Sequence, residues 1–215
     1  MWLLGLGVSA LLLGAGQARA ALTGVNLGTG APPSTLGGYS MTRFTDSSAA
    51  DFTNVSSLSS PNGFTLSFNT APNKRTVGVD WATWSHGYNG AVYFQTGNSE
   101  VLSLSPNAGA FDFWIEPNNF GVFTITATAQ DGSTVTESIN GDAGASGVGF
   151  FADSGSFIAS ITVTAPSSAA GFAMGEFGVA PVAAVPEPAS LALLGVATLG
   201  LAGYGWRRRK AAVAA

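Results

Sequence analysis

The stretch Phe120-Gly-Val-Phe-Thr-Ile-Thr-Ala-Thr-Ala-Gln-Asp-Gly-Ser-Thr-Val-Thr-Glu-Ser-Ile139 has the pattern of a β-hairpin. Two runs rich in Thr, Val and Ile flank Gln130-Asp-Gly-Ser133, and Asp-Gly is the favoured dipeptide of a type I′ turn. Because side chains alternate along a strand, Phe123, Ile125 and Ala127 share one face. The segment therefore predicts two antiparallel strands with one face in a core.

Alternation of the same kind continues on both sides of this hairpin. Strands are predicted at residues 36–44, 64–69, 76–82, 111–116, 148–152, 157–164 and 171–179. Roughly ten short strands, without a helical stretch long enough for a crossover, predict an all-β domain over residues 21–180. We expect antiparallel sheets packed as a β-sandwich with jelly-roll topology, although linear order does not fix the topology.

Composition excludes several classes of function. The chain has 215 residues and no cysteine, so disulfides and zinc-thiolate sites are excluded. Between residues 21 and 185 there are three basic and eleven acidic residues, which give this segment a net charge of −8. A surface so poor in cations cannot neutralise phosphates, so nucleic acid is not an expected partner.

The N-terminus has the pattern of a signal peptide over residues 1–20. An apolar run leads to the small-x-small site Ala18-Arg-Ala20, and cleavage is predicted before Ala21. The segment before Leu3 lacks the usual Lys or Arg. The alternative interpretation is a buried N-terminal helix.

The C-terminus has the pattern of a membrane anchor. A linker over residues 181–188 ends in Pro186-Glu187-Pro188, and residues 189–206 carry no charge. As a helix these would measure roughly 27 Å, just enough to cross a bilayer core. The basic cluster follows at once and predicts a cytoplasmic tail over residues 207–215, with membrane lipid as a partner of the helix. It consists of Arg207, Arg208, Arg209 and Lys210.

The tail resembles the PEP-CTERM sorting signal of exopolysaccharide-producing Gram-negative bacteria. This resemblance implies recognition by an exosortase, a membrane protease that cuts near the P-E-P motif and passes the ectodomain to the cell surface or extracellular matrix. Pro186, Glu187 and Pro188 are then a processing site. The alternative is an ordinary type I anchor. The run from Phe120 to Phe177 also resembles the lectin-like ectodomains common among such proteins, which supports the fold more than any chemistry.

No catalytic constellation is recognisable in the sequence. His86 is the single histidine, so a histidine-metal triad is excluded, and no G-x-S-x-G elbow is present. Gly147-Val-Gly-Phe-Phe-Ala152 fits G-x-G-x-x-A formally, but its neighbours are predicted strands rather than a helix. We therefore predict a protein that is not an enzyme, with His86 as a loop residue.

A glycan contact is the binding hypothesis that the residues suggest. If Phe113 points inward, Asp112, Trp114 and Glu116 lie on the outward face, where an exposed indole flanked by acceptors could stack on a sugar. Trp84 could add to such a platform together with Trp81, Tyr88, Tyr93 and Phe94. The alternatives are ordinary packing and a solvated face.

No cofactor is predicted. A structural calcium ion near Asp142, Asp153 and Glu176 remains open, since no D-x-[DN]-x-[DN]-G loop is present.

The leading hypothesis is an exported, exosortase-processed and non-enzymatic protein associated with extracellular polysaccharide or matrix. The alternatives are a glycan-active hydrolase, which needs two opposed carboxylates across a cleft, and a structural coat protein without a ligand.

Overall fold

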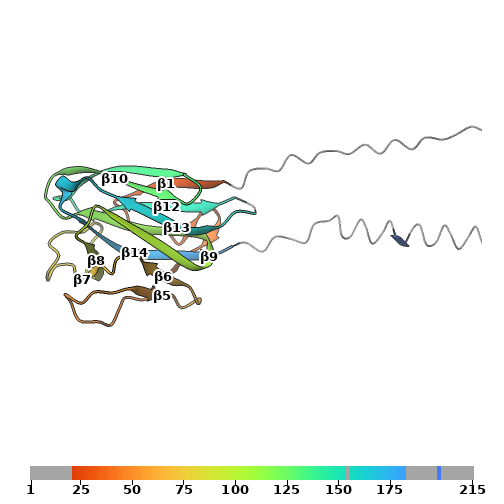
Figure 1. Ribbon diagram of the computed structural model, residues 1–215, viewed down its shortest axis with the longest axis horizontal. Helices are drawn as coiled ribbons and strands as arrows, with labels where there is room; N and C mark the ends of the chain where they lie inside the picture. Colours follow the sequence, from red (N-terminus) through yellow and green to blue (C-terminus); the bar gives the residue numbers. More distant parts are fainter. Residues whose placement is uncertain (1–20, 154, 183–197, 200–215) are drawn as a thin grey trace, which may run out of the picture.

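The computed structural model describes residues 21–153, 155–182 and 198–199, and the first two ranges form an all-β domain (Figure 1). The predicted all-β, antiparallel class is confirmed: every ladder between named strands is antiparallel, and the one helix of this domain is a single 3-10 turn, η1 (Ser167–Ala169). The strands are β1 (Leu22–Gly28), β2 (Thr35–Leu36), β3 (Tyr39–Ser40), β4 (Thr42–Arg43), β5 (Ser57–Ser59), β6 (Thr65–Phe68), β7 (Asn73–Thr76), β8 (Ala91–Gln95), β9 (Ser99–Pro117), β10 (Val122–Ala129), β11 (Thr134–Asn140), β12 (Ser146–Ala152), β13 (Ile158–Thr164) and β14 (Phe172–Pro181).

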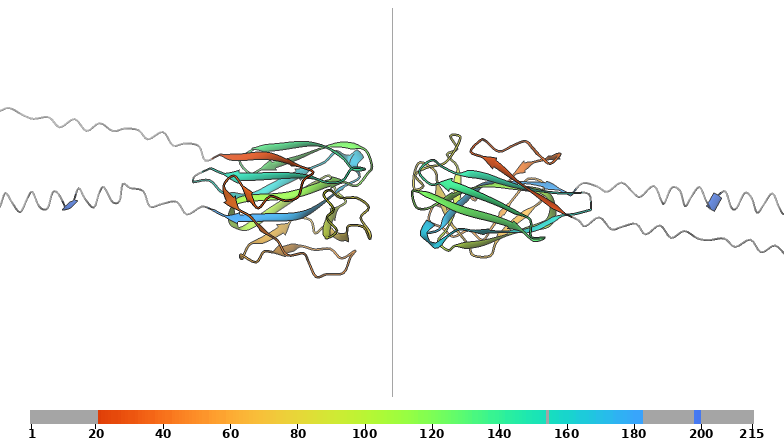
Figure 2. Two further views of the ribbon diagram at one scale, coloured as in Figure 1. Left: turned by 180° about the vertical axis from the view of Figure 1, so that it is seen from behind. Right: turned by 90° about the horizontal axis from the view of Figure 1, so that it is seen from above.

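Strand β9, 19 residues long, organises the sheet (Figure 1). Its first half pairs with β6 on one side and with β13 on the other, and β5, β10 and β11 extend this group. Its second half pairs with β12 and β14, and β1, β4, β8 and β7 extend that group. The result is one curled sheet of twelve strands, in which β9 belongs to both groups (Figure 2). The sandwich with jelly-roll topology stays a prediction.

The main core lies between these two groups of strands. Leu66, Leu102 and Ile161 come from the first group, and Phe111 and Phe113 from the second, and all five belong to one buried cluster. Ring contacts tie the groups together, because Phe68 of β6 stacks on Tyr93 of β8 with centroids 5.8 Å apart. Burial of these large side chains is the main stabilising contribution to the domain.

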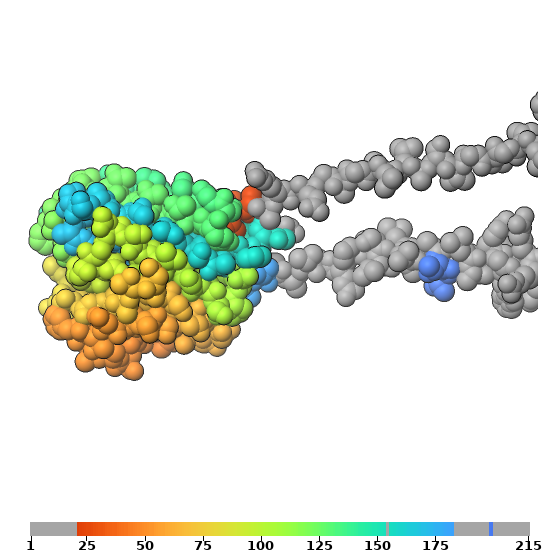
Figure 3. All heavy atoms as spheres, viewed as in Figure 1, coloured from red at the N-terminus to blue at the C-terminus, as the bar shows by residue number. Residues whose placement is uncertain are grey.

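A second layer of side chains covers the other face of β9, β12 and β14. Segment 32–46 and loop 81–88 lie across this face, and we call them the covering segments. Small apolar clusters form beneath them, one around Leu36 and Ala110 and the other around Trp81 and Ala173. In Figure 3 the residues from β4 to β7, coloured orange to yellow, gather on one side of the domain. The second half of β9 is therefore buried on both faces.

The solvent face of the first strand group carries hydroxyl groups instead of charges. Its exposed or half-buried hydroxyl residues are Ser57, Ser59, Thr65, Ser67, Ser99, Ser103, Ser105, Thr124, Thr126, Thr128, Thr134, Thr136, Ser138, Ser160, Thr162 and Thr164. Cross-strand register aligns them in rows, for example Ser99, Thr164, Thr126 and Thr136. Glu100 and Glu137 of the same strands are buried. The exposed hydroxyl groups therefore give this domain a hydrophilic surface although it has few charged residues.

The hairpin of β10 and β11 is confirmed, but the predicted type I′ turn is wrong. A type I′ turn needs positive φ at both central residues, and of Gln130, Asp131 and Gly132 only Gly132 has positive φ, at 91°. The N–H of Gly132 donates to Ala129 O, and the N–H of Ala129 donates to Ser133 O, at 2.9 and 2.8 Å. These bonds define a three-residue loop in which glycine takes the left-handed position.

Two other predicted strands differ from the structure. Residues 77–81 form a turn after β7, with Val79 77% exposed, because Gly78 at φ 79° reverses the chain. Residues 36–44 divide into the short strands β2, β3 and β4, because Gly37 and Gly38 also adopt positive φ. Strands β1, β5 and β8 were not predicted; their short or glycine-containing runs show little alternation. The first half of β9, residues 99–110, was not predicted either, and β7 overlaps the predicted strand 76–82 only at Thr76.

The predicted leader at residues 1–20 and most of the predicted linker and anchor lie outside the described residues. No helix among the residues that the structure describes is long and apolar enough to span a membrane. Of the predicted anchor, residues 189–206, only Thr198 and Leu199 are described. The start of β1 and the end of β14 lie at the same end of the domain (Figure 1).

We expect Gly147→Ala to destabilise the domain. Gly147 lies beside Trp114 in the β9–β12 ladder, and a Cβ there would lie 2.6 Å from Cε2 of the fully buried Trp114. Overpacking of this kind costs about 1–3 kcal/mol. Chemical denaturation of the purified protein would measure it, with Gly30→Ala as the control, since a Cβ at Gly30 meets nothing within 4 Å. Equal stability of the two variants would contradict this account of the covered face.

Candidate functional site: a cavity at the bulge of β14

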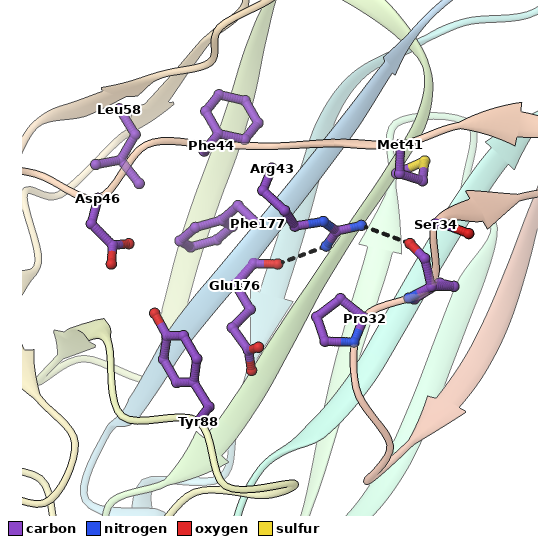
Figure 4. A pocket seen from close by; sticks show the side chains of 11 residues that line it. Pro32, Ser34, Met41, Arg43, Phe44, Asp46, Leu58, Tyr88, Glu176 and Phe177 are labelled. Atoms are coloured by element: carbon purple, nitrogen blue, oxygen red, sulfur yellow. Dashed lines mark hydrogen bonds between the residues drawn. The ribbon is translucent and has the colours of Figure 1, made fainter.

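A cavity of about 550 Å³ opens between the covering segments, above a bulge in β14 (Figure 4). Segment 32–46 forms one wall, Tyr88 of loop 81–88 forms another, and Leu58 of β5 completes the lining. Its lining residues are Pro32, Pro33, Ser34, Met41, Arg43, Phe44, Asp46, Leu58, Tyr88, Glu176 and Phe177. The volume lies in the range of small-molecule sites, about 300–1,000 Å³.

Glu176 occupies the bulge in a conformation that is unusual for its residue type. The pairing of β14 with β9 shifts between Gly175 and Gly178, and Glu176 has a left-handed φ of 54°. Its carboxylate accepts hydrogen bonds from Nε1 of Trp84 at 2.7 Å and from Nε2 of His86 at 2.9 Å. A left-handed non-glycine residue costs about 1–3 kcal/mol, and such residues cluster at functional sites. The bulge directs a carboxylate into the region between the covering segments.

Arg43 fixes one wall of the cavity to the sheet beneath it. Its Nη1 and Nη2 atoms donate to the two carboxylate oxygens of Asp112 at 2.6 and 2.9 Å. The same atoms donate to Glu176 O at 3.0 Å and to Pro33 O at 3.2 Å, as Figure 4 shows. Burial raises the pKa of Asp112, and the bonds from Arg43 oppose that shift. All four terminal N–H groups of Arg43 are therefore engaged within the protein.

Asp46 and Tyr88 form the polar side of the cavity. Burial raises the pKa of Asp46, while the Ala91 N–H, which donates to it at 3.3 Å, and the charge of Lys74 oppose the shift. Burial also raises the pKa of Tyr88, and the charges of Asp46 and Glu176 raise it further. The Tyr88 hydroxyl donates to Ala91 O at 2.9 Å, so its lone pairs remain as acceptors. The cavity thus combines two carboxylates, a phenol and an apolar wall.

The predicted exposed face at Asp112, Trp114 and Glu116 is wrong. The alternation itself is correct, since these residues lie opposite Phe111, Phe113 and Ile115. However, none of the three is more than 1% exposed, because the covering segments pack over them. Glu116 accepts hydrogen bonds from Nε1 of Trp81 and from Thr83 Oγ1. A stacking platform for sugar at this strand would need an exposed indole, which the fold does not provide.

Trp84, the fourth residue of the predicted glycan contact, is half-buried and lies beside the cavity. Its ring centroid is 6.1 Å from that of Tyr88, and its indole N–H is engaged by Glu176. Trp81 and Tyr93 are buried, so the predicted aromatic platform is mainly packing. His86 lies in loop 81–88, as predicted. Nδ1 of His86 lies 3.1 Å from Ser85 Oγ, and Nε2 bonds Glu176.

Sequence reasoning missed Arg43 and Asp46. It considered Glu176 only for calcium, and Tyr88 as part of an aromatic platform for glycan or of ordinary packing. Two sequence features bear on them. Arg43 is one of only three cations between residues 21 and 185, and Phe44 follows it directly. Glu176 stands in Gly-Glu-Phe-Gly, and glycine on both sides of a charged residue within a strand indicates a bulge.

Among the described residues, no group of three or more His, Cys, Asp or Glu side chains could hold a metal ion. Asp142 and Asp153 do not line the cavity with Glu176. Calcium binding stays a prediction. Of the predicted processing sites, only Ala21 is described; Ala18, Ala20, the Pro186–Pro188 motif and the basic cluster at 207–210 lie outside the described residues.

Comparison with known families finds a match to a sorting motif near the C-terminal end of the sequence. Residues 184–210 match the PEP-CTERM protein-sorting motif. PEP-CTERM signals are recognised by exosortase and mark secreted proteins processed for the cell surface, so this chain carries the signal of an exosortase-sorted, exported surface protein. The predicted resemblance of the tail is confirmed. No curated protein and no solved structure matches the chain.

We expect Glu116 to make the stability of the domain depend on pH. Burial raises the pKa of Glu116 from 4.5 to about 7, although the bonds from Thr83 and Trp81 oppose the shift. Because the folded protein holds this proton more tightly than the unfolded chain, the contribution of Glu116 to stability is largest below pH 4.5 and falls as pH rises through 7. One pKa unit corresponds to about 1.4 kcal/mol. The loss from this group therefore reaches at most about 3.5 kcal/mol.

Thermal unfolding of wild type and Glu116→Gln across this pH range would measure the effect. The variant keeps an acceptor for Trp81 but cannot ionise, so its pH profile should be flatter than that of wild type. Parallel profiles would show that another group is responsible.

Proposed function

We propose that this protein is a non-enzymatic surface protein that exosortase processes and that binds extracellular polysaccharide through the cavity at Glu176. The PEP-CTERM motif at residues 184–210 supports the sorting step. The observation that carries the binding step is the concave site itself, in which acceptors face an apolar wall of Met41, Phe44 and Leu58. We also propose that the ectodomain is a β-sandwich, with its two strand groups joined through β9.

The chemistry of the cavity suits a saccharide. Sugars present hydroxyl donors around a ring whose C–H faces are apolar, and the cavity offers carboxylate acceptors together with apolar side chains. Asp46 and Glu176 supply the acceptors. The half-buried Tyr88 supplies aromatic surface on which a ring could pack. The alternative of a coat protein without a ligand gives no role to a strained glutamate at the base of a cavity.

A glycan-active hydrolase is the second candidate, and one observation favours it. Asp46 and Glu176 line the same cavity, and burial raises the pKa of Asp46, as a general acid would require. Against this, Glu176 is held by two donors, Trp84 and His86, as a fixed acceptor. Release of reducing ends from polysaccharide, abolished by Asp46→Asn, would identify the hydrolase and overturn the non-enzymatic proposal.

The sorting proposal predicts the mass of the mature protein. In the native host, intact mass and membrane fractionation should show loss of the leader and of the tail, with a new C-terminus near Pro186–Pro188. A strain without exosortase should keep the tail in the membrane fraction. A tail retained in the normal host would instead indicate a type I anchor.

The binding proposal predicts that filling the cavity releases the protein from polysaccharide. Ser34 lines the cavity, so Ser34→Trp should place an indole in it, whereas Ser138→Trp changes an exposed serine on the hydroxyl face of β11. Retention on the polysaccharide of the host should fall about tenfold or more for Ser34→Trp, corresponding to at least about 1.4 kcal/mol, and stay unchanged for Ser138→Trp. Equal retention of both variants would exclude this cavity as the binding site.

A further inference from the structure

We infer that the cavity at Glu176 selects a cationic sugar unit, an unacetylated amino sugar, and rejects uronic acids. This inference rests on the proposed function, since it specifies the ligand of the same site. It follows from an inventory of the donors, acceptors and charges that line the cavity.

The cavity has many hydrogen-bond acceptors and few free donors among the described residues. The four terminal N–H groups of Arg43 are bound by Asp112, Glu176 O and Pro33 O. The Tyr88 hydroxyl proton goes to Ala91 O. The hydroxyl of Ser34 and the Nε–H of Arg43 are then the lining side-chain donors that are not committed in these contacts. Two such donors replace only part of the hydration of a carboxylate, so a uronic acid would bind less well than a ligand that brings its own donors.

The acceptors of the cavity are carboxylates that are incompletely satisfied. Asp46 accepts the N–H of Ala91 at the long distance of 3.3 Å and also lies in hydrogen-bonding contact with the Tyr88 hydroxyl, and burial disfavours its charge. Glu176 accepts two hydrogen bonds, while two carboxylate oxygens offer about four acceptor sites. An ammonium group brings three donors and a positive charge. It therefore satisfies these carboxylates better than a hydroxyl, which brings one donor and no charge.

The charges around the cavity sum to a negative site. The charge of Arg43 is balanced by Asp112, which leaves Asp46 and Glu176 as the lining carboxylates without a neutralising arginine. His86 lies against Glu176, and Lys74, whose charge reaches Asp46, is itself paired with Asp51 at 3.3 Å. An ammonium group in the cavity would balance this charge in a partly desolvated space, where charge-assisted hydrogen bonds are strongest.

The test compares three disaccharides of similar size on the full chain, expressed without exosortase and purified in detergent. The probes are a β-1,4-linked glucosamine dimer, its N-acetylated form and a galacturonate dimer, titrated by calorimetry at neutral pH and low ionic strength. We expect the amine form to bind roughly tenfold or more tightly than the acetylated form, and its affinity to fall with salt, with the uronate not binding.

Two other outcomes would overturn the inference in distinguishable ways. Equal binding of the amine and acetylated forms would remove the charge selectivity but leave the proposed saccharide site intact. Absence of binding by all three, together with unchanged polysaccharide retention of Ser34→Trp, would remove the saccharide site as well.

Matched variants assign the selectivity to the carboxylates. Asp46→Asn and Glu176→Gln keep shape but exchange an acceptor oxygen for a donor, and each should reduce the preference for the amine form severalfold. Asp153→Asn removes an exposed carboxylate outside the cavity lining and should leave the preference unchanged. Thermal unfolding of each variant confirms that it is folded. An amine preference that persists in both cavity variants would contradict the inference.

Discussion

The bidentate pair of Arg43 and Asp112 is the interaction on which the covered face of this domain depends. Asp112 lies in the middle of β9 with its side chain fully buried, and Arg43 lies about one-third exposed above it. An unpaired buried carboxylate would be strongly destabilising, so the pair holds segment 32–46 against the sheet. Because the same guanidinium binds backbone oxygens of Pro33 and Glu176, it also sets the wall of the cavity and supports the bulge at its base.

The cavity lies where the two covering segments leave part of β14 uncovered, at the bulge between Gly175 and Gly178. In a regular β14, alternation would place Glu176 on the same face as Phe172 and Met174, which belong to the main core. The bulge instead holds Glu176 in a left-handed conformation, and the indole of Trp84 and the imidazole of His86 hold its carboxylate in place. Local strain of this kind persists only where surrounding contacts determine it. Tight packing elsewhere in the core thus stabilises an irregular site at its edge.

The outer faces of the two strand groups carry different kinds of polar residue. The solvent-exposed face of the first strand group carries rows of serine and threonine. Threonine favours strands, serine is small and polar, and neither residue needs a counter-charge. The second group is covered on its outer face, so it can bury Asp112 and Glu116 in hydrogen bonds. Four of the eleven carboxylates between residues 21 and 185 are buried, namely Glu100, Asp112, Glu116 and Glu137. Asp46 and Glu176, which line the cavity, define the electrostatics of the candidate site.

The sequence by itself determined the all-β class, most of the later strands and the sorting signal, because these depend on local alternation and contiguous motifs. Phe111 and Phe113 face the core as alternation predicts, and the β10–β11 hairpin lies where Asp-Gly places it. Only the tertiary structure decided that Asp112, Trp114 and Glu116 are buried, because segments 32–46 and 81–88, distant in sequence, cover them. The same distant contacts join Arg43, Asp46, Tyr88 and Glu176 into one cavity, and no local pattern encodes such a meeting.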